Sequence, residues 1–414
     1  MKATFLFVLT LYAGWMIPAV RAQDSVAAKL TPSAIEGRIR EIRMGEIVVR
    51  TRPGAEVEVR QTRHEFLFGT AVPNPLAEND ADAMSPEDRK QFIEILSENF
   101  NYAVHENALK WYDCEKEPGV VDYTTADRLW EICHELDIPM RGHCIFWEKE
   151  EFLMPWLKEL NNDDLRAAVA RRGIGVTGHF RGRIHEFDLN NEMIHGDFFR
   201  RRLGWGVINE MAWLARAGNP DAVLYVNDYG ILVDGGVNAS AFISQIGTLL
   251  ANGVPIGGIG CQGHLASRYR SPMSPELVQR MLDRLARFDL PIKITECLFD
   301  ADTEENRARE LRNIFPVYFA HPGVEAIVMW GFWEGTAWQP QTALWRKDWT
   351  PTPQGLAYRD LVFGEWWTET SGKADRDGMF RTAAFYGDYR ITVNGETQNV
   401  TLSKKDRSAR VIVQ

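Results

Sequence analysis

The chain has 414 residues, 45% of them hydrophobic, and a formal net charge of −10 at pH 7. This hydrophobic content is ample for one domain of barrel size with roughly 50 to 100 residues of accessory structure. The acidic balance argues against a polyanionic partner such as nucleic acid and suits a neutral ligand.

Residues 1–22 predict a secretory leader. Lys2 is followed by a nearly unbroken apolar run to Trp15 and then by small residues, which is the order of features in a signal peptide. We expect the mature chain to begin near Gln23, and because Lys2 and Arg21 leave with the leader, its net charge becomes −12 instead of −10. The expected location is secreted or periplasmic. No later apolar run reaches the roughly 18 to 20 residues of a membrane-spanning helix, so no membrane contact is expected.

An N-terminal β-rich segment is predicted for residues 23–64. Within it, residues 45–62 alternate between apolar and polar side chains around Pro53-Gly54, which is the pattern of a β-hairpin. We expect this segment to be a small appendage of the main domain.

Short β-rich runs alternate with helical patterns across residues 65–368. The strand candidates are 66–72, 102–106, 140–147, 186–191, 222–227, 258–262, 291–296 and 325–332, and the helix candidates are 86–99, 125–136, 163–179, 205–217, 239–252, 275–288 and 304–320. Ser85 and Ser274, each followed by proline, are predicted N-caps. Eight βα units in about 300 residues predict an α/β fold, a (β/α)8 TIM barrel, whose active sites lie at the carboxyl ends of the strands.

Residues 369–414 are predicted to hold a linker and a small C-terminal β module. The expected linker is 370–378, and the later stretches 385–395 and 410–413 alternate as strands do. Asn394-Gly395 is a strong signal for a tight turn. Because no catalytic cluster falls in either appendage, we expect the barrel alone to carry the activity.

Two carboxylates stand at the ends of buried strand candidates. Glu192 closes the run 187–191, and Glu296 closes the run 291–295. A carboxylate in such a place costs several kcal/mol to desolvate unless it is paired, hydrogen-bonded or at the mouth of a cleft. Two of them at one barrel mouth would form the acid and nucleophile pair of a glycosidase.

Ordered motifs at these strand ends resemble glycoside hydrolase family 10, the retaining endo-β-1,4-xylanase family. The motifs are Phe68-Gly69-Thr70-Ala71-Val72, Glu106-Asn107-Ala108-Leu109-Lys110-Trp111, Arg141-Gly142-His143 with Trp147, Asn190-Asn191-Glu192, Asn227-Asp228-Tyr229, Gln262-Gly263-His264, Thr295-Glu296, and Trp330 with Trp338. The third- and fourth-strand motifs are more similar to the plant-type branch of the family. Two departures stand out: Glu148 replaces the His common after the third-strand Trp, and Cys297-Leu298 replaces the Leu-Asp that often follows the nucleophile.

The resemblance implies that Glu192 is the general acid and base and Glu296 the nucleophile of a retaining mechanism. In such enzymes the two carboxyl groups lie about 5 to 5.5 Å apart. The residues implied to bind substrate are Glu106, Asn107, Lys110, His143, Trp147, Asn191, Tyr229, Gln262, His264, Trp330 and Trp338. Without the resemblance, Glu106 and Lys110 could equally form a local ion pair, and His143 could be a core histidine.

The implied activity is endo-acting hydrolysis of β-1,4-xylan by double displacement, without a cofactor. The alternatives are the same machinery on another β-linked plant or algal glycan, and a non-catalytic carbohydrate-binding protein. The expected partner is the polysaccharide, and the expected state is a monomer. The histidines and carboxylates of the site have no metal-ligand spacing. The five cysteines, scattered without a CxxC pair, are expected to be buried free thiols.

Overall fold

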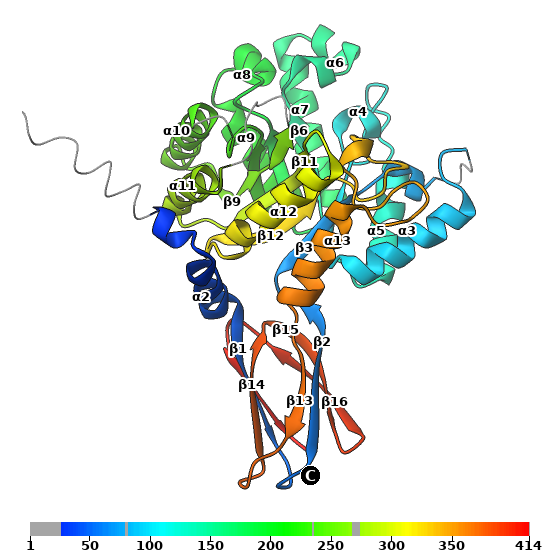
Figure 1. Ribbon diagram of the computed structural model, residues 1–414. Coiled ribbons are helices and arrows are strands. Elements are labelled where there is room, and N and C mark those ends of the chain that lie inside the picture. Colours follow the sequence, from blue (N-terminus) through cyan, green and yellow to red (C-terminus); the bar gives the residue numbers. More distant parts are fainter. Residues whose placement is uncertain (1–25, 79–81, 234–235, 267–273, 414) are drawn as a thin grey trace, which may run out of the picture.

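The computed structural model describes residues 26–78, 82–233, 236–266 and 274–413. The predicted leader, residues 1–22, lies outside these ranges. The described chain has two parts, an α/β barrel and a β module beneath it in Figure 1. None of the described helices has the length and apolar character needed to cross a membrane.

Parallel strands form the wall of the barrel, in the order β5-β4-β3-β12-β11-β9-β8-β7-β6. Their bounds are β3 Leu67–Val72, β4 Tyr102–His105, β5 Met140–Arg141, β6 Phe146–Trp147, β7 Glu186–Asn191, β8 Val223–Asp228, β9 Ile256–Cys261, β11 Ile292–Asp300 and β12 Val324–Met329, with the short β10, His264–Ala266, beside β11. The eight predicted strand positions are confirmed, and the third is split into β5 and β6. The strands are buried on both faces, as in other parallel sheets covered by helices.

Gly142 closes the barrel between β5 and β6. It forms a parallel bridge with Phe187 of β7, and its N–H donates to the carbonyl of Glu186 at 2.8 Å. A Cβ atom at position 142 would lie 2.4 Å from the Phe187 ring. Only glycine therefore leaves room for the Phe187 ring against this backbone.

Helices surround the strands (Figure 1). Their bounds are α3 Pro86–Asn99, α4 Trp111–Cys114, α5 Thr124–Glu135, α6 Pro155–Glu159, α7 Asn162–His179, α8 Phe198–Leu203, α9 Val207–Gly218, α10 Val237–Ala251, α11 Pro275–Leu285, α12 Glu304–Phe319 and α13 Pro353–Arg359. The two predicted caps are confirmed: Ser85 Oγ accepts from Asp88 N at 3.0 Å, and Ser274 Oγ accepts from Leu277 N at 3.3 Å. Each hydroxyl satisfies a backbone donor that has no partner inside its helix.

The remaining strands form the two-sheet β module. One sheet has the order β14-β1-β17 and the other β13-β2-β15-β16. Their bounds are β1 Met44–Arg50, β2 Glu56–His64, β13 Glu369–Lys373, β14 Met379–Phe385, β15 Gly387–Val393, β16 Glu396–Leu402 and β17 Ser408–Ile412. Ile47, Val57 and Ile391 belong to an apolar core of the module that is separate from the barrel core. Because β1 and β2 precede the barrel and the other strands follow it, the barrel is inserted within the module.

Two expectations for the appendages are wrong, and one element was not expected. Residues 45–62 do not form a hairpin, because β1 and β2 lie in different sheets and pair with strands from the other end of the chain. The expected linker 370–378 begins with most of β13, which pairs with β2. The N-terminal segment also contains a helix, α2, Pro32–Arg43. The predicted turn is confirmed, since Asn394 and Gly395, with φ of 48° and 90°, join β15 to β16.

Arg43, the last residue of α2, fastens this end of the chain to the barrel. Its guanidinium donates to the carbonyls of Phe319 at 2.8 Å and Val324 at 2.7 Å, and its centre lies 4.5 Å from the middle of the Phe66 ring. Phe385 of β14 packs on Phe319 with ring centroids 6.2 Å apart. The module and α2 therefore cover the amino-terminal end of the barrel strands.

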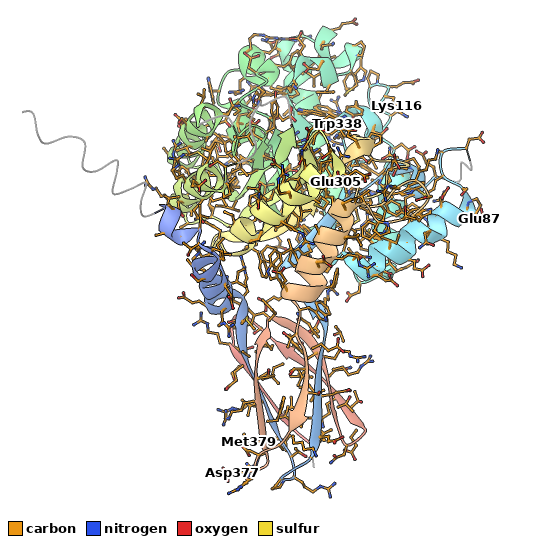
Figure 2. The ribbon with its side chains drawn as sticks, viewed as in Figure 1. Glu87, Lys116, Glu305, Trp338, Asp377 and Met379 are labelled. Atoms are coloured by element: carbon orange, nitrogen blue, oxygen red, sulfur yellow. The ribbon has the colours of Figure 1, made fainter. Side chains whose placement is uncertain are left out.

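The tip of the module points away from the carboxyl ends of the strands. Figure 2 shows Trp338, which follows β12, in the upper part of the barrel, whereas Asp377 and Met379 lie at the lower tip of the module. Side chains at that tip are therefore remote from the end of the barrel where the sequence places the chemistry.

Candidate active site

The thirteen predicted site residues all line one cleft of about 580 Å³ at the carboxyl ends of the barrel strands. They are Glu106, Asn107, Lys110, His143, Trp147, Asn191, Glu192, Tyr229, Gln262, His264, Glu296, Trp330 and Trp338. The cleft has three further lining residues that the sequence reasoning did not select, namely Tyr112, Lys149 and Phe152. The barrel therefore brings together residues that are up to 232 positions apart in the chain.

Crossed hydrogen bonds hold the two glutamates relative to each other. Asn227 Nδ2 donates to Glu296 Oε1 at 2.8 Å, while the Asn227 carbonyl accepts from Glu192 N at 2.9 Å. Gln262 does the reverse: its Nε2 donates to Glu192 Oε1 at 2.9 Å, and its carbonyl accepts from Glu296 N at 2.8 Å. Each amide residue thus binds the side chain of one glutamate and the backbone of the other. Asn227 was not among the predicted site residues, although it belongs to the Asn-Asp-Tyr motif that carries part of the family resemblance.

Glu192 follows β7 in a tight turn. Its backbone is left-handed, with φ of 59°, and its carbonyl accepts from Gly196 N at 3.0 Å. The second carboxylate oxygen, Oε2, accepts from Trp147 Nε1 at 3.0 Å and lies 3.4 Å from Lys149 Nζ. The carboxyl group is therefore held by the turn, by an amide, by an indole and by an ammonium group.

Glu296 is buried in β11 and surrounded by donors. His264 Nε2 donates to Glu296 Oε2 at 3.0 Å, and His143 Nδ1 lies 3.9 Å from Oε1. Burial alone would raise the pKa of Glu296, but His264, His143 and Lys110 outweigh it and lower that pKa to about 2. Glu296 is thus ionised at neutral pH.

Two buried charged residues, Asp188 and Arg141, hold His143 in place. Its Nδ1 donates to Asp188 Oδ2 at 2.7 Å, and Arg141 pairs with the other oxygen of Asp188. Arg141 and Asp188 are both fully enclosed. Because a buried charge is costly unless it is paired, this cluster fixes the ring of His143 in the cleft. His143 is thus buried and paired like a core histidine and also lines the cleft.

One side of the cleft is lined by residues that follow β4. Lys110 Nζ donates to Asn107 Oδ1 at 3.0 Å and lies 4.9 Å from the centre of the Trp147 ring. Tyr112 Oη donates to the same Asn107 oxygen at 3.2 Å. Burial raises the pKa of Glu106 to about 7, although Lys110 opposes the shift. These polar groups are set for hydrogen bonds with a hydroxyl-rich ligand.

Aromatic rings supply flat apolar surface around the glutamates. Trp147 stacks on Phe152 with centroids 3.8 Å apart, and Tyr229 stacks on His195 at 3.7 Å. Trp338 is 52% exposed and lies 5.4 Å from the His264 ring. Polar groups beside aromatic faces are the combination that holds a pyranose ring.

The first departure from the family pattern, Glu148, does not face the cleft. Its buried carboxylate pairs with Arg200 Nε at 2.9 Å and accepts from Asn190 Nδ2 at 3.1 Å, and burial raises the pKa of Glu148. Arg200 also donates to the carbonyls of Met193 and Gly196. Glu148 therefore anchors the turn that carries Glu192.

The second departure lies beside His264. Leu298 of β11 is buried and stands in register with His264 of β10. Cys297 is buried, as are the other four cysteines, and all five are unpaired thiols, as expected. Within the described ranges, no group of three or more His, Cys, Asp or Glu side chains is arranged to hold a metal ion.

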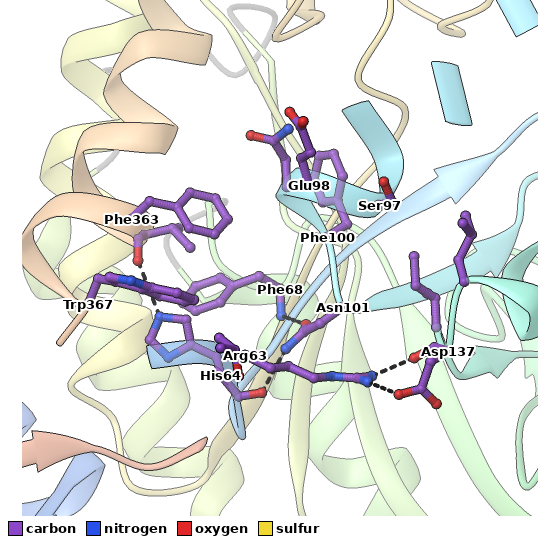
Figure 3. Close-up of a pocket in the computed structure, with 15 residues that line it drawn as sticks. Arg63, His64, Phe68, Ser97, Glu98, Phe100, Asn101, Asp137, Phe363 and Trp367 are labelled. Carbon is purple, nitrogen blue, oxygen red and sulfur yellow. Dashed lines mark hydrogen bonds and ion pairs between the residues drawn. The ribbon is translucent and has the colours of Figure 1, made fainter. Parts of the chain in front are cut away.

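A smaller hollow of about 230 Å³ lies at the other end of the barrel (Figure 3). Arg63 pairs there with Asp137 at 2.5 Å, and Asn101 Nδ2 donates to the His64 carbonyl at 2.9 Å. Burial lowers the pKa of His64 to about 4. These groups bond to one another and join the barrel to the module, so the hollow has a structural role.

Comparison with known proteins gives one family. The model of glycosyl hydrolase family 10 matches residues 60–361. The chain is 37% identical over 364 residues to Anti-sigma-I factor RsgI6 of Acetivibrio thermocellus, with 86% of this chain and 46% of that protein covered. It is 34% identical over 366 residues to Endo-1,4-beta-xylanase 1 of Arabidopsis thaliana, with 87% and 37% covered. The chain thus spans less than half the length of these two relatives.

Solved structures have the same barrel. Native xylanase 10B from Thermotoga maritima superposes with a TM-score of 0.64 at 25% identity, covering 73% of this chain and 96% of that one. Xylanase 10B from Thermotoga petrophila RKU-1, in complex with xylobiose, superposes with a TM-score of 0.64 at 24% identity, covering 73% and 95%. The shared part corresponds in extent to the barrel.

Proposed function

Because the chain belongs to glycosyl hydrolase family 10, we propose that it is an endo-acting retaining glycosidase that cleaves β-1,4-xylan. The observation that carries the proposal is the pair of glutamates held by crossed bonds from Asn227 and Gln262 in one cleft. In this proposal Glu296 is the nucleophile and Glu192 is the general acid and base. Two carboxylates in different environments are what these two roles require.

In the first step, a carboxylate oxygen of Glu296 attacks the anomeric carbon while the glycosidic C–O bond breaks. Glu192 gives its proton to the leaving oxygen, so the leaving chain departs as a neutral alcohol and a covalent glycosyl-enzyme remains. In the second step, Glu192 takes a proton from water, whose oxygen attacks the anomeric carbon and releases Glu296. Glu192 is then protonated again, and one water has been consumed.

The surroundings of Glu296 and Asn191 support this sequence. The depressed pKa of Glu296 keeps the attacking oxygen ionised. Asn191 Oδ1 accepts from Asn227 Nδ2 at 3.1 Å, which leaves the Asn191 amide N–H groups for the 2-hydroxyl of the sugar. That hydrogen bond strengthens as positive charge develops on the ring.

Xylan is the proposed substrate because several relatives are named endo-1,4-beta-xylanases and one related structure holds xylobiose. The same machinery on another β-linked glycan is the alternative among enzymes. The alternative outside the enzymes is a glycan-binding module without turnover. The presence of both Glu192 and Glu296 favours turnover over binding alone.

Product analysis tests the proposal. We expect xylans to be cut internally into short oligosaccharides, with far slower release from mixed-linkage glucan and cellulose. Proton NMR of the first reducing ends should reveal the β-anomer before mutarotation, because a covalent intermediate retains the configuration. Initial appearance of the α-anomer would contradict the role of Glu296 as nucleophile. Tight binding of xylan without any cleavage would favour the binding module.

We further propose that the protein acts outside the cytoplasm as a monomer, with the polysaccharide as its partner. The support for export is the leader-like pattern of residues 1–22. Mass spectrometry of the exported protein is expected to find an N-terminus near Gln23. An intact N-terminus on exported, active protein would remove this support.

A further inference from the structure

Lys149 lies directly after the third-strand motif and reaches Glu192. Its Nζ is 3.4 Å from Glu192 Oε2 and 3.2 Å from Glu151 Oε1. The ammonium group also lies 5.3 Å from the Phe152 ring centre and 5.5 Å from that of Tyr229. Its side chain is only 18% exposed. Lys149 is therefore enclosed by the cleft wall and held against one catalytic carboxyl group.

Resting on the proposed function, we propose that Lys149 is a positioning residue that holds Glu192 and sets the upper pH limit of its action as general acid. Lys149 acts through Glu192 and does not itself need to touch the substrate. No role for this residue follows from the family motifs, which end before it.

The position of Glu192 is the first part of this role. Gln262 holds Oε1 at 2.9 Å, and Trp147 holds Oε2 at 3.0 Å from the side of β6. Lys149 approaches the same Oε2 from the following loop. Without Lys149, Oε2 keeps a single neutral donor, so the carboxyl group gains freedom to rotate away from the glycosidic oxygen.

The charge of Lys149 is the second part. Partial burial disfavours its charge, but Glu192 and Glu151 outweigh that cost and raise the pKa of Lys149. Lys149 thus carries a full positive charge across the pH range in which glycosidases work. A cation this close stabilises the ionised form of Glu192 over its protonated form. The proposal therefore predicts that removing this charge moves the alkaline limb of the activity profile upward.

The other charged groups around Glu192 are paired elsewhere. Asp228 of β8 pairs with His195 at 2.7 Å, and Glu148 pairs with Arg200 at 2.9 Å. The other titratable groups that line the same cleft are Glu106, Lys110, Tyr112, His143, Tyr229, His264 and Glu296, and the exposed Glu151 pairs with Lys149. Among the described residues, Lys149 is the cation whose ion pair with Glu192 is within 4 Å.

The experiment is the pH profile of kcat/KM for Lys149→Met on soluble xylo-oligosaccharides. We expect the alkaline limb to move up by about one pH unit and the rate at the optimum to fall a few-fold, from the lost positioning. Lys149→Arg, which keeps the charge, is expected to restore the original limb. Lys90→Met, the same change at an exposed lysine of α3, serves as the matched control with an unchanged profile.

If folded Lys149→Met keeps the alkaline limb of the parental enzyme, the proposal is overturned. A change confined to KM would also overturn it, because Lys149 would then be a substrate contact. A second readout does not depend on xylan: the midpoint of the Glu192 carboxyl titration, followed by carbon-13 NMR, is expected to move up in Lys149→Met. If that midpoint moves and no glycan is cleaved, the proposed function fails while the electrostatic coupling stands. If the midpoint stays, the coupling itself is refuted.

Discussion

Replacing Glu296 with alanine is expected to abolish turnover, with a loss of at least about 10⁴-fold in kcat. The change removes the oxygen that attacks the anomeric carbon, and in the described part of the chain no other carboxylate is held where Asn227 and His264 hold this one. Rates on soluble xylan, measured at equal concentrations of folded protein, check the prediction. Glu305→Ala alters an exposed glutamate of α12 (Figure 2) and is the matched control, expected to keep full activity.

Glu192→Ala separates the two roles. Aryl glycosides with activated leaving groups need little help from an acid, so this variant is expected to form the glycosyl-enzyme from them and to lose far more activity on xylan. Azide, which can replace water without a general base, is expected to restore turnover on the activated substrate. Equal losses on activated and unactivated substrates would contradict the assignment of Glu192.

A chain that ends at Thr370 is expected to lose the folded β module and to be less stable than the full chain. From the sequence alone the barrel is expected to suffice, but the structure joins the N- and C-terminal strands in one core. The truncation leaves Ile47, Val49, Val57 and Val59 without the side chains that cover them. Exposing four such residues costs about 6 to 12 kcal/mol, which matches the whole stability of a typical domain, about 5 to 15 kcal/mol.

Soluble yield and thermal unfolding followed by circular dichroism check this expectation. Val411 and Ile412 of β17 provide a milder matched pair, because Val411 is buried in the module while Ile412 is 64% exposed. Val411→Ala is expected to lower the Tm, and Ile412→Ala to leave it nearly unchanged. A truncated chain with the parental Tm would mean that the module is not one folding unit with the barrel.

Much of the barrel could be predicted because its signals are local. Ser85 and Pro86 mark the start of α3 in the sequence, and the helix begins at Pro86. The buried runs ending near Glu192 and Glu296 became β7 and β11, so both carboxylates could be assigned to the same end of one sheet. The carboxyl ends of all strands in a parallel barrel lie at the same end of the barrel, so the strand assignments alone predict that these residues meet.

The module and part of the site could not be predicted, because their signals are not local. No local sequence pattern near Met44 predicts that it pairs with Phe385, which is far away in the sequence. Helix α2 has a cap at Thr31 but few buried residues, so its apolar pattern is weak. Lys149 lacks a distinctive pattern of its own, and the motif that contains Asn227 does not show which side chain Asn227 holds, because that contact comes from another strand.

The insertion of the barrel within the module also determines the order in which the two parts can fold during translation. Strands β1 and β2 leave the ribosome roughly 300 residues before β13, an interval of about 15 to 60 s at about 5 to 20 residues per second. Throughout it, their apolar faces and unpaired edges have no native partner. The barrel has all its strands before the module does, so the module is the last part to close. Only a chain translated through β17 buries those edges, and a chain halted earlier keeps them open to chaperones and proteases.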